Sequence, residues 1–239
     1  MLDRNLDWEG CVNARDLGGL PTAEGRRTRW GAIVRSDSLD HLTRAGWSAL
    51  QTHGIRTIVD LRNDEELGYE AQARPDGLTT VHVPLDDIAD TEFWKYLWDE
   101  ELDGTPLLHG PFLYRKPERC AAAVAAVARA GPGGVVFHCG IGRDRTGIVA
   151  LLLLALVGVT PDEIASDYEL SNDRLRPHWA KLGLEDQSAW AEERLRRANT
   201  SARALILATL ASLDDVDAYL RTGGLGDDDL AAIRARLLQ

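Results

Sequence analysis

The sequence has few cysteines, and their arrangement excludes two common classes of protein. Cys11, Cys120 and Cys139 are the three cysteines among 239 residues, an odd number that is widely spaced. A disulfide framework needs paired cysteines, and a structural zinc site needs closely spaced cysteine and histidine ligands. The chain therefore fits a reducing compartment, and we expect neither a metal nor another cofactor.

The sequence is also poor in basic residues relative to acidic ones. It has 27 lysines and arginines against 38 aspartates and glutamates, a formal net charge of -11. Such a charge repels nucleic acid and anionic membrane surfaces at long range. We therefore expect no nucleic-acid partner, and an anionic ligand would need a local device to bind.

Long hydrophobic runs are missing as well. The longest, residues 148–159, is shorter than the ~20 residues that cross a bilayer. Residues 1–5 lack the basic flank and apolar stretch of a secretory signal. We predict no stable membrane insertion and a cytoplasmic location, with non-classical secretion left open.

What the sequence does have is an alternation of short apolar runs with helical patterns. The runs are rich in β-branched residues and are followed by amphipathic or alanine-rich stretches. We predict an α/β fold with a mostly parallel central sheet flanked by helices. The predicted strands are residues 31–35, 56–61, 81–85 and 135–137.

No repeat or linker divides the chain, so we predict a single domain over residues 1–239. Residues 93–114 are dense in aromatic side chains, which predicts either a packed insertion or a lid within 90–116. The last third, 160–239, is predicted to form a helical layer. Its helices are predicted at residues 184–198, 201–210, 214–221 and 227–238.

The segment 138–147 joins a predicted strand directly to an apolar helix. Backbone N–H groups at such a junction point inward, and the helix dipole favours negative charge there. A thiolate at the position of Cys139 would be stabilised by the same field and could act as a nucleophile. Arg145 could grip two phosphate oxygens with its planar guanidinium. This segment is the local device that an anion requires.

The rest of the segment suits a phosphate cradle. Glycines permit positive φ and close backbone approach, and Thr146 can donate its hydroxyl to the sulfur. The competing interpretation is an inert buried cysteine, but the coincidence of residue types favours a site. The predicted phosphate-binding residues are His138, Gly140, Ile141, Gly142, Arg143, Thr146 and Gly147.

The string His-Cys-Gly-Ile-Gly-Arg-Asp-Arg-Thr-Gly at 138–147 resembles the signature loop of the protein tyrosine phosphatase superfamily, and of the bacterial atypical tyrosine phosphatases in particular. Residues 13–19, 29–31, 35–37 and 59–62 are similar to the N-terminal pattern of that family. The resemblance implies a phosphotyrosine-phosphatase-like fold. It also implies that Asp144 is the general acid.

Other aspartates compete for the role of acid. Many dual-specificity phosphatases carry it on a separate loop after a strand, where Asp86 and Asp87 stand here. Asp60, at the end of another predicted strand, is a weaker candidate. In the N-terminal pattern, Arg15 and Asp16 are predicted to form a structural ion pair.

We therefore predict a phosphoric monoester hydrolase that acts through a phosphocysteine intermediate. The resemblance implies a protein-tyrosine phosphatase with dual or phosphoinositide specificity, so the predicted partner is a phosphorylated protein or a phosphoinositide. The alternatives are a phosphoinositide or inositol phosphate phosphatase, a sulfurtransferase, and a catalytically inactive phosphate-binding module. The sequence leaves the oligomeric state open.

Overall fold

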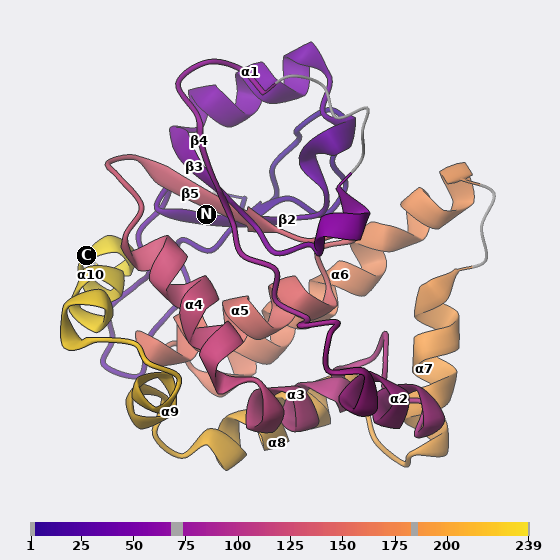
Figure 1. The fold of residues 1–239 in the computed structure, drawn as a ribbon. Helices are drawn as coiled ribbons and strands as arrows, with labels where there is room; N and C mark the ends of the chain where they lie inside the picture. Colours follow the sequence, from indigo (N-terminus) through magenta and orange to yellow (C-terminus); the bar gives the residue numbers. More distant parts are fainter. Residues whose placement is uncertain (1–2, 68–73, 183–185, 239) are drawn as a thin grey trace.

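The centre of the protein is a five-stranded sheet with the strand order β1-β2-β5-β3-β4. A computed structural model describes residues 3–67, 74–182 and 186–238 (Figure 1). The last four strands of that order are parallel, and the short β1 pairs antiparallel with β2. The predicted α/β fold with a mostly parallel sheet is confirmed. The strands are β1 (Arg15–Asp16), β2 (Ile33–Ser36), β3 (Ile55–Asp60), β4 (Thr79–His82) and β5 (Gly134–His138).

β5 lies in the middle of the sheet because it is apolar on both faces. Val135, Val136 and Phe137 are all fully buried, which is typical of a parallel strand covered from both sides. His138 pairs in register with Ser36 of β2 and with Asp60 of β3. The loops after these three strands therefore meet at one edge, where open parallel sheets bind their ligands.

Helices cover both faces of the sheet (Figure 1). α1 (Arg44–Thr52) lies over one face, above a smaller buried cluster that includes Leu50 and Ile58. α4 (Pro117–Ala128) and α5 (Asp144–Leu156) cover the other face and belong to the main core. α5 is apolar almost all round, and ten of its residues are buried, as a central helix requires.

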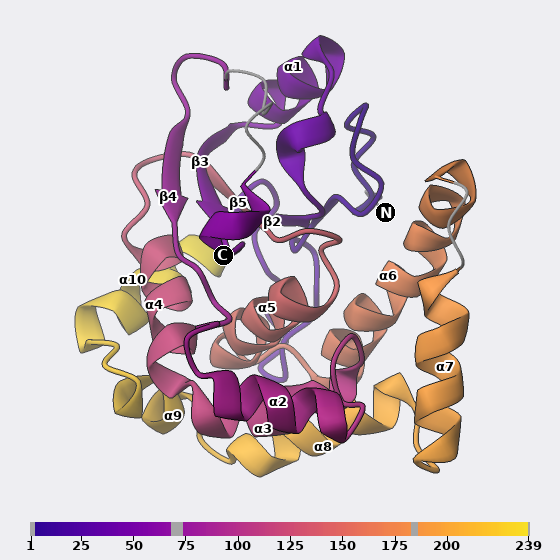
Figure 2. The ribbon, with the colours of Figure 1, turned by 45° about the vertical axis from the view of Figure 1, so that its right-hand side comes forward.

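α8, α9 and α10 form a further layer beyond α4 and α5, while α6 and α7 lie to one side of α5 (Figure 2). α8 packs on α6, while α9 and α10 pack on α4 and α5. Ile206, Leu220 and Ile233 of this layer belong to the main core. The single domain stays a prediction. The helices are α6 (Pro161–Leu182), α7 (Gln187–Arg197), α8 (Ala202–Leu213), α9 (Val216–Thr222) and α10 (Asp227–Leu237).

The aromatic segment predicted as an insertion or a lid folds into α2 (Thr91–Asp99), a 3-10 turn and α3 (His109–Arg115). Phe93 and Phe112 pack into the main core, whereas the side chains of Trp98 and Tyr114 are exposed. One face of the segment is thus anchored. Its movement as a lid stays a prediction.

Two predicted boundaries differ from the structure for physical reasons. β4 ends at His82 rather than at residue 85, because the next two amides that face β3, those of Val83 and Leu85, donate to the carbonyls of the adjacent residues Asp60 and Leu61, so that the regular two-residue register of a parallel ladder is lost. α7 begins at Gln187, after Asp186 caps it by accepting from the amide of Ser188; the predicted start at 184 lies outside the described residues. Within the described ranges, no helix is long and apolar enough to cross a membrane.

Candidate active site

The candidate site is the loop between β5 and α5. Cys139 follows the last residue of β5, and 2% of its surface is exposed. The Thr146 hydroxyl, in the first turn of α5, donates to the Cys139 sulfur over 3.1 Å. The sulfur therefore lies at the carboxyl end of the central strand and beside the N-terminus of a helix, where negative charge is favoured.

Two glycines of the loop are required by close contacts. Gly142 has a φ of +71°, and a Cβ atom there would lie 2.4 Å from the Ser36 carbonyl oxygen. A Cβ on Gly147 would lie 2.8 Å from the Tyr168 ring. The loop is thus pressed against the end of β2, and α5 against α6, at positions where any side chain would force a shift.

Arg145 is held at the front of the loop by two carboxylates. Its guanidinium binds Glu66 bidentately, with Nη2 2.6 Å from Oε1, and Nη1 lies 3.0 Å from Asp86 Oδ2. Burial alone would lower the pKa of Arg145, but these carboxylates raise it. We call Arg145 and Glu66 the front pair. An incoming phosphate dianion would meet this arginine already occupied by anionic partners.

Sequence reasoning missed Glu66. It lies in a 3-10 turn (Asp64–Glu66) just after β3, which the structure pairs with the site strand β5. The sequence predicted the strand at 56–61 but not its place beside the site strand. Burial would raise the pKa of Glu66, but the hydrogen bond from Arg145 lowers it. Glu66 is therefore an anion directly beside the proposed phosphate position.

Asp144, the predicted acid, lies in the first turn of α5 and points away from the front pair. Its carboxylate accepts from Arg143 Nε over 3.3 Å and from the Tyr168 hydroxyl over 3.3 Å. Burial alone would raise the pKa of Asp144, but the adjacent Arg143 charge lowers it below its ordinary value. In the resting protein Asp144 is therefore ionised.

The alternative acids occupy different places. Asp86 faces the site: it accepts from Asn63 Nδ2 over 2.9 Å, and burial raises its pKa despite the nearby Arg145. Asp87 turns toward the helices and pairs with Lys116 and Arg119. The structure thus brings only Asp86, of these two, to Arg145.

Asp60 is committed to a buried network. It binds Arg62 through two hydrogen bonds and lies 3.5 Å from the ring of His138. Burial opposes ionisation of Asp60, but the Arg62 hydrogen bonds lower its pKa to about 2. Burial holds the pKa of His138 at about 4, so that its ring is neutral. These contacts hold the ends of β3 and β5 together, which suits a structural role for Asp60.

Arg143 is buried, and its side chain extends toward Gly104. Its Nη2 donates to the Gly104 carbonyl over 2.7 Å, and within the described chain its Nη1 has no hydrogen-bond partner. Together with Trp190 of α7 it lines a cavity of about 480 Å³ next to the loop. The remaining residues that line this cavity are Asp103, Gly104, Ile141, Asp144, Asp186 and Gln187.

The predicted ion pair between Arg15 and Asp16 was wrong. Arg15 binds Asp167 of α6, with Nε 3.1 Å from Oδ1, because its side chain enters the interior from β1. Asp16 faces the opposite way, since successive residues of a strand alternate. It accepts from the amides of Gly18 and Gly31 and pairs with His53.

The central strand of the parallel sheet places a cysteine at a helix N-terminus, and an arginine lies in the first turn of that helix. This arrangement defines the cysteine-dependent phosphatase class of site. A model of the tyrosine phosphatase family matches residues 6–239. The chain therefore belongs to the tyrosine phosphatase family. This membership confirms the predicted class of enzyme.

Several bacterial proteins are similar to this chain. A protein named as a tyrosine-protein phosphatase from Cupriavidus necator is 36% identical over 176 residues, 71% of this chain and 64% of that protein. The triple specificity protein phosphatase PtpB of Mycobacterium tuberculosis is 28% identical over 273 residues, 96% of this chain and 97% of PtpB. A tyrosine-protein phosphatase of Nostoc commune is 28% identical over 228 residues, 87% of this chain and 74% of that protein. The chain thus matches slightly less than two thirds of the length of the Cupriavidus protein. These similarities agree with the predicted bacterial atypical tyrosine phosphatase.

Proposed function

We propose that this chain hydrolyses phosphate monoesters through a phosphocysteine intermediate at the loop 138–147. The observation that carries the proposal is the Cys139 sulfur beside the α5 N-terminus, 3.1 Å from the Thr146 hydroxyl. Arg145, two residues into the same helix, supplies the charge for the phosphate oxygens. A cysteine at such a position is a typical activated nucleophile.

The reaction proceeds in two displacements. The Cys139 thiolate attacks phosphorus in line, the bond from phosphorus to the leaving oxygen breaks, and a carboxylic acid protonates that oxygen. Arg145 and the loop amides bind the equatorial oxygens as negative charge develops. Water then attacks the phosphocysteine, the same carboxylate takes its proton, and Thr146 donates to the departing sulfur.

Two carboxyl groups are candidates for the acid, and they differ in charge state. Asp144 holds the position that the family resemblance gives to the acid, but Arg143 lowers its pKa. The pKa of Asp86 is raised, and Asp86 touches Arg145. A bound phosphate dianion raises the pKa of any nearby carboxyl group. We propose Asp144 as the acid. Asp86 is the alternative, and its higher proton affinity favours it.

For the substrate, we propose phosphotyrosine in proteins, with dual specificity. The name of PtpB assigns triple specificity to that protein, and the other two relatives carry the name of tyrosine phosphatases. A polyphosphorylated inositol would need a second cation beside the loop. Arg143 is the nearest candidate, but its Nε and Nη2 already bind Asp144 and the Gly104 carbonyl, so that within the described chain Nη1 alone is left for a ligand. This occupation favours a phosphoprotein over a phosphoinositide.

We further propose that the protein acts in the cytoplasm. Its three cysteines are free thiols, and the nucleophile works only when reduced.

The test is hydrolysis of para-nitrophenyl phosphate by the wild type, by Cys139→Ser and by Cys120→Ser as a matched control in the core. We expect Cys139→Ser to lose at least ~10⁴-fold in kcat, while Cys120→Ser keeps most of its activity. Turnover by Cys139→Ser would place the chemistry elsewhere. A wild type that binds phosphate without turnover would be a binding module, and transfer of sulfur from thiosulfate to cyanide would indicate a sulfurtransferase.

A further inference from the structure

Five carbonyl groups of the candidate loop accept hydrogen bonds from neighbouring parts of the chain. The His138 carbonyl accepts from the Leu61 amide and the Gly140 carbonyl from the Ser38 amide. The next three carbonyls accept from side chains: those of Ile141 and Gly142 from Asn13 Nδ2, at 3.0 and 3.2 Å, and those of Gly142 and Arg143 from Arg35 Nη2, at 2.9 and 3.4 Å.

This arrangement fixes the direction of the loop amides. In a planar trans peptide, the N–H of one residue points opposite to the C=O of the residue before it. Because the carbonyls of residues 141–143 are held toward Asn13 and Arg35, the amides of residues 142–144 point to the opposite side of the loop, where the anion binds. A single flipped peptide would instead place a carbonyl oxygen against the phosphate.

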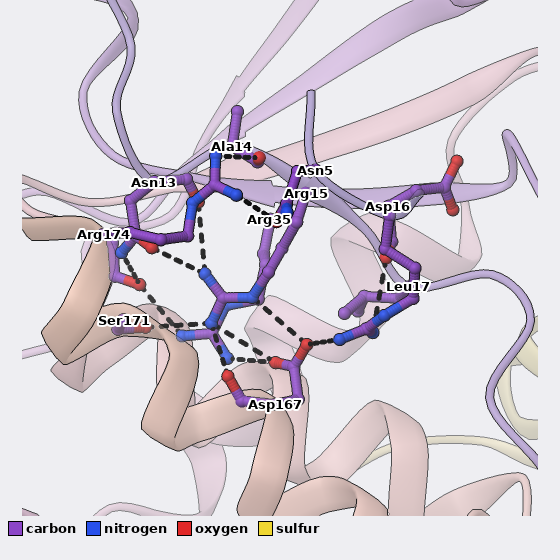
Figure 3. A network of polar contacts seen from close by, with 12 residues as sticks. Asn5, Asn13, Ala14, Arg15, Asp16, Leu17, Arg35, Asp167, Ser171 and Arg174 are labelled. Carbon is purple, nitrogen blue, oxygen red and sulfur yellow. Dashed lines mark hydrogen bonds and ion pairs between the residues drawn. The ribbon is translucent and has the colours of Figure 1, made fainter. Parts of the chain in front are cut away.

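Both donors are oriented by one buried carboxylate. Asp167 of α6 binds Arg35 Nη1 over 2.7 Å and Arg15 Nε over 3.1 Å (Figure 3). Arg15 in turn donates to Asn13 Oδ1 over 2.6 Å, which leaves Asn13 Nδ2 to face the loop. We call Asn13, Arg15, Arg35 and Asp167 the rear network.

The rear network is sealed from water. Each of its four residues is at most 1% exposed. A third arginine, Arg4, also binds Asp167, with its Nη2 2.7 Å from the carboxylate, so that three arginines share this one negative charge. Polar groups buried so completely cost free energy unless they are bound in one geometry, and such networks specify a unique arrangement.

We propose that Asn13 and Arg35 are positioning residues that aim the loop amides at the phosphate, and that Asp167 orients them. The inference rests on the proposed function, because it assigns a purpose to the anion cradle. The rear network contacts the loop from behind, so none of its residues touches the reacting atoms. It should therefore act on the affinity for the oxyanion and on kcat together.

The variant that isolates this role is Asn13→Asp. The new carboxylate keeps an oxygen for Arg15, but it replaces the amide donor by an acceptor that faces two carbonyls. Asn199→Asp is the matched control, since it makes the same charge change at an exposed residue in the connection between α7 and α8. A second pair, Arg35→Met and Arg35→Lys, removes and partly restores the other donor.

The readout is the competitive inhibition constant of inorganic phosphate against para-nitrophenyl phosphate, measured with the full chain. This constant does not depend on the concentration of folded enzyme, so a variant whose only defect is a smaller folded fraction leaves it unchanged. We expect Asn13→Asp to raise it about tenfold or more, as the loss of two hydrogen bonds predicts. Arg35→Met should do the same and Arg35→Lys less, while Asn199→Asp stays within twofold of the wild type.

An inhibition constant within twofold of the wild type in both Asn13→Asp and Arg35→Met would overturn the inference. If Asn13→Asp does not fold, Asn13→Ala and Arg35→Lys carry the same test. Failure of the proposed function is distinguishable, because calorimetric titration of phosphate into Cys139→Ser reports binding without turnover. A chain that binds phosphate but never hydrolyses it would refute the function, and the effect of Asn13→Asp on that binding would still decide the inference.

Discussion

The two sides of the candidate loop 138–147 are held in opposite ways. Behind it, the rear network is buried and binds carbonyl groups that keep their partners throughout the proposed reaction. In front of it, Arg145 is 18% exposed and binds Glu66, which is 34% exposed, through a contact that a phosphate must share or replace. The comparison indicates that a permanent support and an exchangeable contact are separated by the thickness of one loop.

The largest expected difference between the rear network and the front pair is in their contribution to the free energy of unfolding. Asp167→Asn leaves Arg15 and Arg35 buried without their counter-charge, so we expect a loss of about 3–5 kcal/mol in the free energy of unfolding. Glu66→Gln removes a partly exposed partner and should cost less than about 1 kcal/mol. Urea denaturation of both variants measures this difference. Equal losses would mean that the front pair is structural too.

Stability should also depend on pH through two buried histidines. Burial holds the pKa of His109 and of His138 at about 4, below their ordinary value of 6.5. The unfolded chain takes up these protons as pH falls below 6.5, while the folded chain does so only near 4. Stability should thus be full above 6.5 and fall toward pH 4, by on the order of 3 kcal/mol for each ring.

His109→Gln should remove about half of this histidine contribution. The exposed His41→Gln is the control and should leave the pH dependence as in the wild type. Denaturation midpoints between pH 7 and pH 4 give the measurement. A pH dependence of His109→Gln identical to that of the wild type would contradict the assignment.

The two candidate proton donors lie on different sides of the loop. Asp144 contacts buried Tyr168, whereas Asp86 contacts the front pair. We expect Asp144→Asn to reduce kcat by about 10²-fold for phenyl phosphate, whose leaving group needs a proton. The loss should be much smaller for para-nitrophenyl phosphate. The same pattern in Asp86→Asn, with Asp144→Asn unaffected, would transfer the role to Asp86.

The smallest effect concerns Glu66 as a competitor for Arg145. Glu66→Gln removes a carboxylate whose oxygen lies 2.6 Å from Arg145 Nη2, so we expect phosphate to bind roughly three- to tenfold more tightly. Competitive inhibition by inorganic phosphate measures it, with Glu193→Gln on α7 as the control. Weaker binding would show that Glu66 orients the arginine instead of blocking it.

The parts of this site that the sequence predicted are those that lie close together along the chain. Cys139, Arg145 and Thr146 fall within eight residues, and the apolar run before them identifies the buried strand. The α/β class followed from the same local patterns. The family resemblance extended this reading to the enzyme class.

What could not be predicted depends on the register of the sheet. Glu66 meets Arg145 across 79 residues, Arg35 meets Gly142 across 107, and Arg15 meets Asp167 across 152. No local pattern reports such a distance. The failed ion pair of Arg15 with Asp16 has the same origin, because neighbours in a strand point to opposite faces.

The position of Asp167 has a consequence for how the protein is made. The residue that anchors the loop from behind comes 28 positions after the cysteine that the loop presents (139 to 167). While the ribosome has released only the chain up to α5, the thiol exists but its cradle has no anchor. We expect nascent chains to pass through an interval in which this sulfur is exposed to oxidants, and to become competent for phosphate only after α6 has emerged.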